Sequence, residues 1–203
     1  MEIVLASRNK KKIAELQTLM SEIKDADIKI LSLDDVGVYG DIEENGDTFE
    51  ANAYIKASVG AAKGYITVAD DSGLCVDALD GAPGVHSARF SGGGDEENNK
   101  LLQEKLADLP DEKRTARFCS TVVCILPEQK CEIVTKGTVE GYISRQPAGT
   151  NGFGYDPYFF YPPFGKTFAQ LSAEEKNAVS HRGKAMREFV TRFEEKIKEY
   201  GLK

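Results

Sequence analysis

The chain has 203 residues, of which 41% are hydrophobic and 29% charged, and its formal net charge is −7. This composition is typical of a folded protein with one substantial core, and it excludes a disordered or fibrous chain. The acidic balance argues against a broad nucleic-acid-binding surface, although one bound nucleotide remains compatible with it. The sequence shows no apolar stretch of membrane-spanning length and no signal-sequence pattern. We therefore expect a cytoplasmic protein with no nucleic-acid or membrane partner.

Apolar periodicity predicts helices interleaved with strands, and hence an α/β protein. In chain order, we expect a strand at 2–6, helices at 11–24 and 48–63, a strand at 65–69, a helix at 95–109, strands at 115–126 and 131–142, and a helix at 181–200. The strands on either side of 127–130 are expected to form an antiparallel hairpin, which makes the sheet mixed. The glycine-rich segment 91–97 is expected to be a mobile loop. The four cysteines have no CxxC spacing, which favours free, mostly buried thiols in a reducing compartment.

Two adjacent carboxylates, Asp70 and Asp71, follow the strand at 65–69 and precede Ser72 and Gly73. Carboxylates held side by side need a cation or a proton to neutralise one of them, so a site for a hard metal is one interpretation. A solvated turn is the other, because Asp-Ser-Gly is common turn chemistry. This segment alone does not decide between them.

A basic segment, residues 7–12, lies between the first strand and the first helix. Free backbone N–H groups at a helix start attract anions, so a triphosphate site is one interpretation and a solvated basic turn the other. The segment lacks the glycines of a Walker A loop. Before the next helix, Thr48 or Asp47 is a candidate N-cap, and Glu43 or Glu44 could complete a Mg²⁺ site with Asp70 or Asp71. Lys56 could reach a phosphate, although a lone helical lysine is usually solvated.

The loop at 152–157 contains an aromatic pair that could stack on a base, although an aromatic-rich turn is the simpler interpretation. Ser172 opens a capping-box pattern that precedes Lys176, and Ser180 is a candidate N-cap for the last helix. His181 and Arg182 at the start of that helix could bind a purine edge or a phosphate. An ordinary surface or capping histidine is the alternative.

Six motifs, taken in order, resemble the inosine triphosphate pyrophosphatase family. They are Ser-x-Asn-x-x-Lys at 7–12, Asn-Gly-x-Thr-Phe-x-x-Asn-Ala at 45–53, Ala-Asp-Asp-Ser-Gly-Leu at 69–74, Gly-Ala-Pro-Gly-Val-His-Ser-Ala-Arg-Phe at 81–90, Gly-Phe-Gly-Tyr-Asp-Pro at 152–157 and Ser-His-Arg at 180–182. The match spans nearly the whole chain, and the joint order of the motifs is specific. The chain departs from the family pattern at Lys11, where glycine is common, and at His86, where tyrosine is frequent.

The resemblance implies Mg²⁺-dependent hydrolysis of non-standard purine nucleoside triphosphates, such as those of inosine, deoxyinosine and xanthosine, to a monophosphate and pyrophosphate. It implies one domain over 1–203, with a strongly twisted mixed sheet, flanking helices and two lobes around a deep active-site cleft, in a homodimer. Asp71 would be the catalytic base or metal carboxylate, and Glu43 a further Mg²⁺ ligand. The implied substrate-binding residues are Ser7, Arg8, Asn9, Lys10, Lys11, Lys12 and Lys56 for the triphosphate, and Ser72, Phe153, Gly154, Tyr155, Asp156, Lys176, His181 and Arg182 for the base and sugar.

Two other functions stay open from the sequence. A regulatory protein could hold a triphosphate without cleaving it, although the intact acidic residues argue against this. A related pyrophosphatase could act on modified pyrimidine nucleotides, in which case the aromatic loop would still stack on the base. A 6-oxo purine would be favoured by a hydrogen-bond donor from His181 or Arg182, whereas the sequence does not indicate how guanine would be rejected.

Overall fold

The structure is a computed structural model that describes residues 1–8, 10–23 and 26–202. Its core element is a seven-stranded sheet with the order β2-β1-β3-β4-β5-β6-β7. The strands are β1 (Glu2–Leu5), β2 (Lys29–Leu31), β3 (Ile66–Val76), β4 (Thr115–Leu126), β5 (Cys131–Ile143), β6 (Phe159–Tyr161) and β7 (Lys166–Thr167). β1 pairs in parallel with β2 and β3, whereas β6 pairs antiparallel with β5 and β7. The prediction of a mixed sheet in an α/β fold is confirmed.

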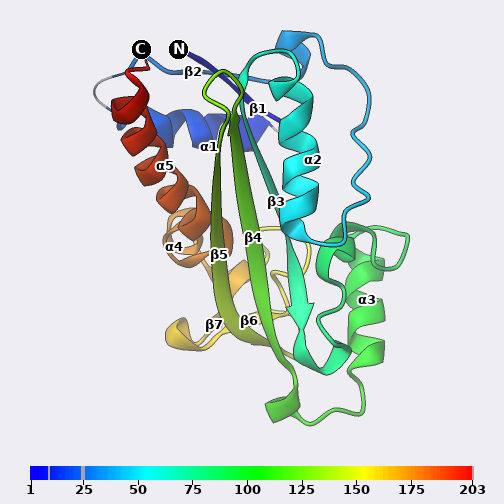
Figure 1. Ribbon diagram of the computed structural model, residues 1–203. Coiled ribbons are helices and arrows are strands. Elements are labelled where there is room, and N and C mark those ends of the chain that lie inside the picture. The colour runs from blue at the N-terminus through cyan, green and yellow to red at the C-terminus, as the bar shows by residue number, and fades with distance from the viewer. Residues whose placement is uncertain (9, 24–25, 203) are drawn as a thin grey trace. The chain divides into compact units, whose positions relative to one another are not determined.

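Five α-helices accompany the sheet in the described part of the chain (Figure 1). They are α1 (Lys10–Met20), α2 (Phe49–Ala61), α3 (Asp95–Lys105), α4 (Ala173–Val179) and α5 (His181–Tyr200). Three predicted caps are present, since Thr48, Ser172 and Ser180 each accept a hydrogen bond from a backbone N–H three residues ahead. The segment expected to be a mobile loop at 91–97 instead contributes its last three residues to the first turn of α3. No helix among the described residues combines the length and apolar composition needed to cross a membrane.

The chain divides into two compact units, and neither is continuous in sequence. Unit 1 comprises Met1–Asp71, Thr121–Lys136 and Ala185–Lys203, and unit 2 comprises Ser72–Ser120 and Gly137–Lys184. In unit 1, α5 packs Phe189 and Phe193 against β1 residues such as Ile3 and Leu5. α2 approaches β3 closely in the same unit, because a Cβ at Gly60 would lie 2.5 Å from Thr67 Oγ1.

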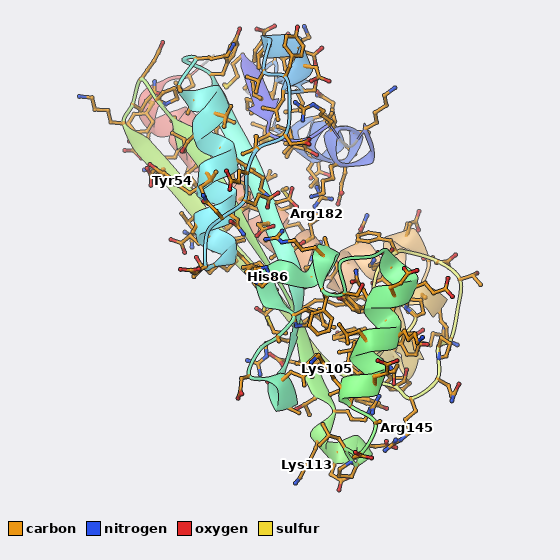
Figure 2. All side chains as sticks on the ribbon, turned by 90° about the vertical axis from the view of Figure 1, so that its right-hand side faces the viewer. Tyr54, His86, Lys105, Lys113, Arg145 and Arg182 are labelled. Atoms are coloured by element: carbon orange, nitrogen blue, oxygen red, sulfur yellow. The ribbon has the colours of Figure 1, made fainter. Side chains whose placement is uncertain are left out.

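The core of unit 2 is rich in aromatic rings. Phe118, Phe159 and Phe168 pack with ring centroids 4.6–5.8 Å apart. Arg114 is also buried in this unit and donates hydrogen bonds to the carbonyls of Leu106 and Ile143 at 2.7 Å. Figure 2 labels two surface residues of this unit, Lys113 and Arg145, on its polar exterior.

Candidate active site

Asp70 and Asp71 lie inside β3, which continues through Gly73 to Val76. The expectation of a strand end and turn at 70–73 is therefore wrong. Because successive side chains of a strand point to opposite faces, the two carboxylates diverge. Asp70 is buried and accepts a hydrogen bond of 2.7 Å from Lys12 Nζ on α1. Each of the two carboxylates therefore has a lysine partner, and that of Asp71 lies on α2.

That partner is Lys56, which joins two acidic side chains of unit 1. Lys56 Nζ donates to Glu44 Oε2 at 2.8 Å and to Asp71 Oδ1 at 3.3 Å. The other oxygen of Asp71 accepts a hydrogen bond of 3.2 Å from Asn52 Nδ2. We call Glu44, Asn52, Lys56 and Asp71 the carboxylate–lysine cluster. Its side chains come from the loop before α2, from α2 itself and from β3.

The charges of this cluster shift the pKa values of its members. Burial raises the pKa of the Asp71 carboxyl, and the attraction of Lys56 and the hydrogen bond from Asn52 offset only part of that rise. Burial alone would lower the pKa of Lys56, but Asp71 and then Glu44 outweigh it and leave that pKa raised. Lys56 is therefore a permanent cation, and Asp71 is more basic than an ordinary aspartate. A carboxylate of this kind is suited to accept a proton or to bind a second cation.

Sequence reasoning did not single out Asn52, and of the two candidate carboxylates Glu43 and Glu44 it is Glu44 that contacts the cluster. Asn52 is fully buried, and its Oδ1 accepts the Gly46 N–H at 2.8 Å, which ties the loop before α2 to Asp71. A Cβ at Gly46 would lie 2.7 Å from the Ala51 Cβ, so this approach requires glycine. Glu43 is exposed, whereas Glu44 binds Lys56. The sequence feature that could have drawn attention to Asn52 is its place in the motif at 45–53. An asparagine buried in a helix needs polar partners, so its contacts with Gly46 and Asp71 are expected once its burial is known.

The residues of the basic segment at 7–12 have different environments. Arg8 donates to Asp34 Oδ1 at 2.8 Å and to the carbonyls of Val38 and Gly40 at 3.0 and 2.8 Å, so its guanidinium fastens the loop at 34–40. Lys10 is exposed in the first turn of α1, and Ser7 is half-buried just before that helix. Asn9 and the side chain of Lys11 lie outside the described residues.

In unit 2, Asp156 organises the glycine-rich loop at 152–156. Its carboxylate is buried and accepts hydrogen bonds from the Phe153 N–H at 2.9 Å and from Lys176 Nζ of α4. Gly152 has φ +79°, and a Cβ there would lie 2.1 Å from Asp156 Oδ2, so glycine is required on both counts. Burial raises the pKa of the Asp156 carboxyl, and Lys176 offsets part of that rise. Asp156 therefore holds the loop in shape, which the sequence alone did not indicate.

The two aromatic residues of this loop have different environments. Phe153 is 77% exposed, and Lys176 Nζ lies 4.7 Å from its ring centroid. Tyr155 is only 5% exposed, and its hydroxyl donates to the Ser87 carbonyl at 2.8 Å. The expectation of a stacking pair is wrong for Tyr155, whose ring is part of the core. Of these two rings, Phe153 is the one exposed to solvent. Gly154 between them is clamped by Asp95 and Asn99 of α3.

The start of α5 places His181 and Arg182 in unit 2 (Figure 2 labels Arg182). The His181 ring stacks on Phe118 with centroids 4.8 Å apart and planes 15° from parallel. Ser180 caps the helix by accepting the Gly183 N–H at 3.1 Å. Both predicted side chains are half-buried, as is Ser72 in β3. His86, also labelled in Figure 2, is exposed on the turn at Gly84–Arg89.

Comparison with known proteins gives a consistent result across nearly the whole chain. The model of the Ham1 family matches residues 3–192, which include parts of both units. A protein of Corynebacterium efficiens named dITP/XTP pyrophosphatase is 46% identical over 199 residues, which are 94% of this chain and 96% of the relative. One of the same name from Mycobacteroides abscessus is 49% identical over 189 residues, covering 92% of this chain and 91% of the relative.

Solved structures agree with the sequence relatives. The Ham1 protein of Staphylococcus aureus has a TM-score of 0.89 and 38% identity, and the alignment covers 97% of this chain and all of that one. A HAM1 protein of Coxiella burnetii also has a TM-score of 0.89, with 42% identity over 96% of this chain and 99% of the other. The family resemblance inferred from the six motifs is confirmed, and the chain belongs to the Ham1 family.

Proposed function

We propose that this protein is a Mg²⁺-dependent nucleoside-triphosphate pyrophosphatase that hydrolyses the triphosphates of inosine, deoxyinosine and xanthosine to a monophosphate and pyrophosphate. Relatives that are 45–49% identical to the chain are named dITP/XTP pyrophosphatases. The structural observation that carries the proposal is the carboxylate–lysine cluster, in which one buried lysine binds the two carboxylates of Glu44 and Asp71. Removal of non-standard purine nucleotides from the nucleotide pool would be the cellular role.

The donor set of the cluster fits Mg²⁺. Mg²⁺ prefers oxygen ligands and is commonly held by one or two carboxylates together with water and substrate phosphates. Glu44 and Asp71 supply such carboxylates, and Lys56 shows that this position stabilises a positive charge. Among the described residues, no group of three or more acidic, histidine or cysteine side chains could enclose a metal by itself. A site completed by the substrate is thus the chemically consistent form, with Glu43 of the same loop as the further ligand implied by the resemblance. A bound Mg²⁺ would neutralise phosphate charge and polarise the phosphorus under attack.

The side chains of the chain itself divide the remaining work. Asp71 would accept the proton of the attacking water through a carboxylate oxygen, because its raised pKa favours proton uptake. Lys56 would stay charged throughout the reaction and would stabilise the negative charge of both the carboxylate and the phosphate oxygens. Lys10 and Lys12, at the start of α1, would bind the outer phosphates of the leaving pyrophosphate. The new bond joins the water oxygen to the α-phosphorus, and the bond from that phosphorus to the bridging oxygen breaks.

Base recognition would be the task of unit 2. The exposed ring of Phe153 offers a stacking face, and the Lys176 ammonium beside it offers a hydrogen-bond donor. His181 and Arg182 carry further donors, which suit the 6-oxo group of hypoxanthine and xanthine and disfavour the amino group of adenine. Ser72, next to Asp71 in the strand, could bind the sugar. The resemblance also implies a homodimer, which analytical ultracentrifugation of the purified protein would test.

A substrate panel tests the proposal. The purified protein is incubated with Mg²⁺ and, separately, with inosine, deoxyinosine, xanthosine, adenosine, guanosine and uridine triphosphates, while monophosphate, pyrophosphate and orthophosphate are followed. Pyrophosphate release confined to the first three substrates, and abolished by a metal chelator, is the expected result. Release of orthophosphate with a diphosphate, or binding without turnover, would overturn it. Preference for the uridine substrate would favour a pyrimidine pyrophosphatase instead.

The variant Asp71→Asn supplies the catalytic control. It keeps the shape of the side chain and removes the basic carboxylate, so turnover should fall by a factor of roughly 100 or more. Asp80→Asn is the matched control, because Asp80 is exposed and has a φ of 51°, a backbone conformation that asparagine also tolerates. Equal activity of the two variants would contradict the role of Asp71.

A further inference from the structure

The loop residues Phe153 and Gly154 are bound at all four of their backbone polar groups. The Asp156 carboxylate accepts the Phe153 N–H at 2.9 Å, and the Phe153 carbonyl accepts the Asp156 N–H at 3.2 Å. The Gly154 N–H donates to Asp95 Oδ2 at 2.7 Å, and the Gly154 carbonyl accepts from Asn99 Nδ2 at 2.8 Å. Asp156 thus holds Phe153 from within the loop, whereas α3 holds Gly154 from outside it.

The two side chains from α3 lie one helical turn apart. Asp95 is the first residue of the helix and Asn99 is four residues further on, so both lie on the same face. Asn99 Nδ2 also donates to the Asp95 carbonyl at 2.8 Å, so one amide group joins the first turn of the helix to the loop. Two carbonyl acceptors around one side-chain atom require a nitrogen there, which fixes the orientation of the amide. We call Asp95 and Asn99 the α3 clamp.

The α3 clamp fixes a part of the backbone that packing leaves open. Gly154 has φ +60°, and a Cβ built there would meet no atom of the described residues within 4 Å beyond its chain neighbours. Hydrogen bonds therefore hold Gly154 in this left-handed conformation, because it has no side chain to pack. The neighbouring Phe153 ring is 77% exposed, so its position depends mainly on the backbone that carries it.

We propose that Asp95 and Asn99 are positioning residues for substrate binding, which hold Phe153 where its ring stacks on the purine base. The inference rests on the function proposed above, in which Phe153 offers the stacking face. A ring that is held in place before the substrate arrives loses less entropy on binding than a ring on a mobile loop. The α3 clamp acts through Phe153 and not on the reacting atoms, so its loss should weaken substrate binding and leave the chemical step unchanged.

Steady-state kinetics of Asp95→Ala with inosine triphosphate provide the first test. Asp95 is exposed, so the variant should fold, and KM should rise roughly 2- to 10-fold while kcat stays unchanged. Asp95→Asn keeps an oxygen that can accept the Gly154 N–H, so it should restore much of the lost affinity. Glu96→Ala is the matched control, because Glu96 is an exposed acidic residue of the same helical turn. Competitive inhibition by inorganic triphosphate, which has no base, should be the same in all these variants.

Phe153→Trp supplies a readout that does not depend on turnover. The chain contains no tryptophan, so this substitution places a single fluorophore on the loop. The time-resolved anisotropy of the indole should fall when Asp95→Ala or Asn99→Ala is added, because the loop then moves on the nanosecond timescale. Titration with inosine monophosphate should quench the fluorescence, with a dissociation constant that rises when the clamp is lost. Adding Glu96→Ala should change neither quantity.

The outcomes separate this inference from the function on which it rests. If inosine monophosphate quenches Phe153→Trp but the anisotropy and KM of the clamp variants match those of the Glu96→Ala control, the inference is wrong and the function stands. A rise in KM with an equal loss of inhibition by inorganic triphosphate would also overturn the inference, because the defect would then be a general one. If the natural protein releases no pyrophosphate from any nucleotide and Phe153→Trp is not quenched, the proposed function fails and the inference fails with it.

Discussion

Asp70 and Asp71 are neighbours in β3, yet their carboxylates bind different lysines, Lys12 for Asp70 and Lys56 for Asp71. The Asp70 side chain is 2% exposed, whereas that of Asp71 is 14% exposed. The strand therefore presents one carboxylate to an internal ion pair and the other to the carboxylate–lysine cluster. Adjacent residues of the same type acquire separate roles from the alternation of the strand.

This asymmetry predicts that the same substitution mainly affects stability at Asp70 and mainly affects turnover at Asp71. Asp70→Asn should lower the free energy of unfolding by roughly 1–3 kcal/mol, because the buried partner of Lys12 loses its charge. Asp71→Asn should change stability less and turnover far more. Urea unfolding and steady-state kinetics of both variants check this. Similar losses of stability in the two variants would contradict the division of roles.

Asn52 should act on catalysis through Asp71. Its hydrogen bond is one of the interactions that lower the pKa of the Asp71 carboxyl, so in Asn52→Ala that pKa should rise further. The acid limb of the kcat profile should then move to higher pH. Asn98→Ala is the matched control, because Asn98 is also buried and hydrogen-bonded but belongs to α3 in unit 2. If both variants lose activity uniformly at every pH, Asn52 has only a structural role.

The protonation of Asp71 predicts a definite pH dependence. The pKa of this carboxyl is raised, so as pH falls it takes up a proton sooner than an ordinary aspartate, and the ionised form needed for catalysis is lost. Activity should be high at neutral to alkaline pH and should decline on acidification above the usual titration range of aspartate. Lys56→Met removes the cation that lowers this pKa and should move the decline to still higher pH. The profile of kcat/KM at fixed free Mg²⁺ measures both effects, and an unmoved profile in Lys56→Met would count against the coupling.

Phe153 and Tyr155 should separate substrate binding from stability. Phe153→Ala removes an exposed ring, so it should leave the free energy of unfolding unchanged. The KM should rise by the equivalent of about 1–3 kcal/mol, which is the usual strength of stacking between a base and an aromatic side chain. Tyr155→Phe removes the 2.8 Å hydrogen bond to the Ser87 carbonyl, which keeps a 3.5 Å bond from Asn98 Nδ2, and should cost about 1 kcal/mol of stability. Thermal unfolding and substrate titration of each variant distinguish the two. A loss of stability in Phe153→Ala would show that its ring is a packing element.

The reactivity of Cys119 should follow pH. Its pKa is lowered, so the thiolate forms at a lower pH than in an ordinary cysteine, and the midpoint for alkylation by iodoacetamide should lie below the usual thiol range. Cys75→Ala removes the main cause of the lowered pKa, and the midpoint should shift upward, although Thr138 and Arg117 remain beside the sulfur and Glu140 still opposes them. Mass spectrometry of the tryptic peptide 118–130 measures the rate. An unchanged midpoint would deny that Cys75 activates its neighbour.

Local pattern was sufficient to predict most elements and three helix caps, because periodicity and capping act within a few residues. It failed at β3, where Asp70 to Gly73 has turn chemistry but the apolar run Leu74 to Val76 continues the strand. Pairing with neighbouring strands outweighed local preference there. The burial of Tyr155 and the bond between Glu44 and Lys56 also escaped prediction, since each depends on a partner that is distant in sequence. The family resemblance implied which residues bind the substrate and the metal. The hydrogen-bond partners of those residues became known only from the structure.

The core of unit 1 joins the first strand of the chain to its last helix, so it cannot be completed until synthesis on the ribosome is nearly finished. Ile3 and Leu5 of β1 are among the first residues made, and their packing partners Phe189, Phe193 and Ile197 of α5 are among the last. The nascent chain must therefore carry an incomplete apolar core through almost the whole of translation. We expect unit 1 to become resistant to protease only after α5 has left the exit tunnel, and stalled chains that stop before Ala185 to remain clients of chaperones.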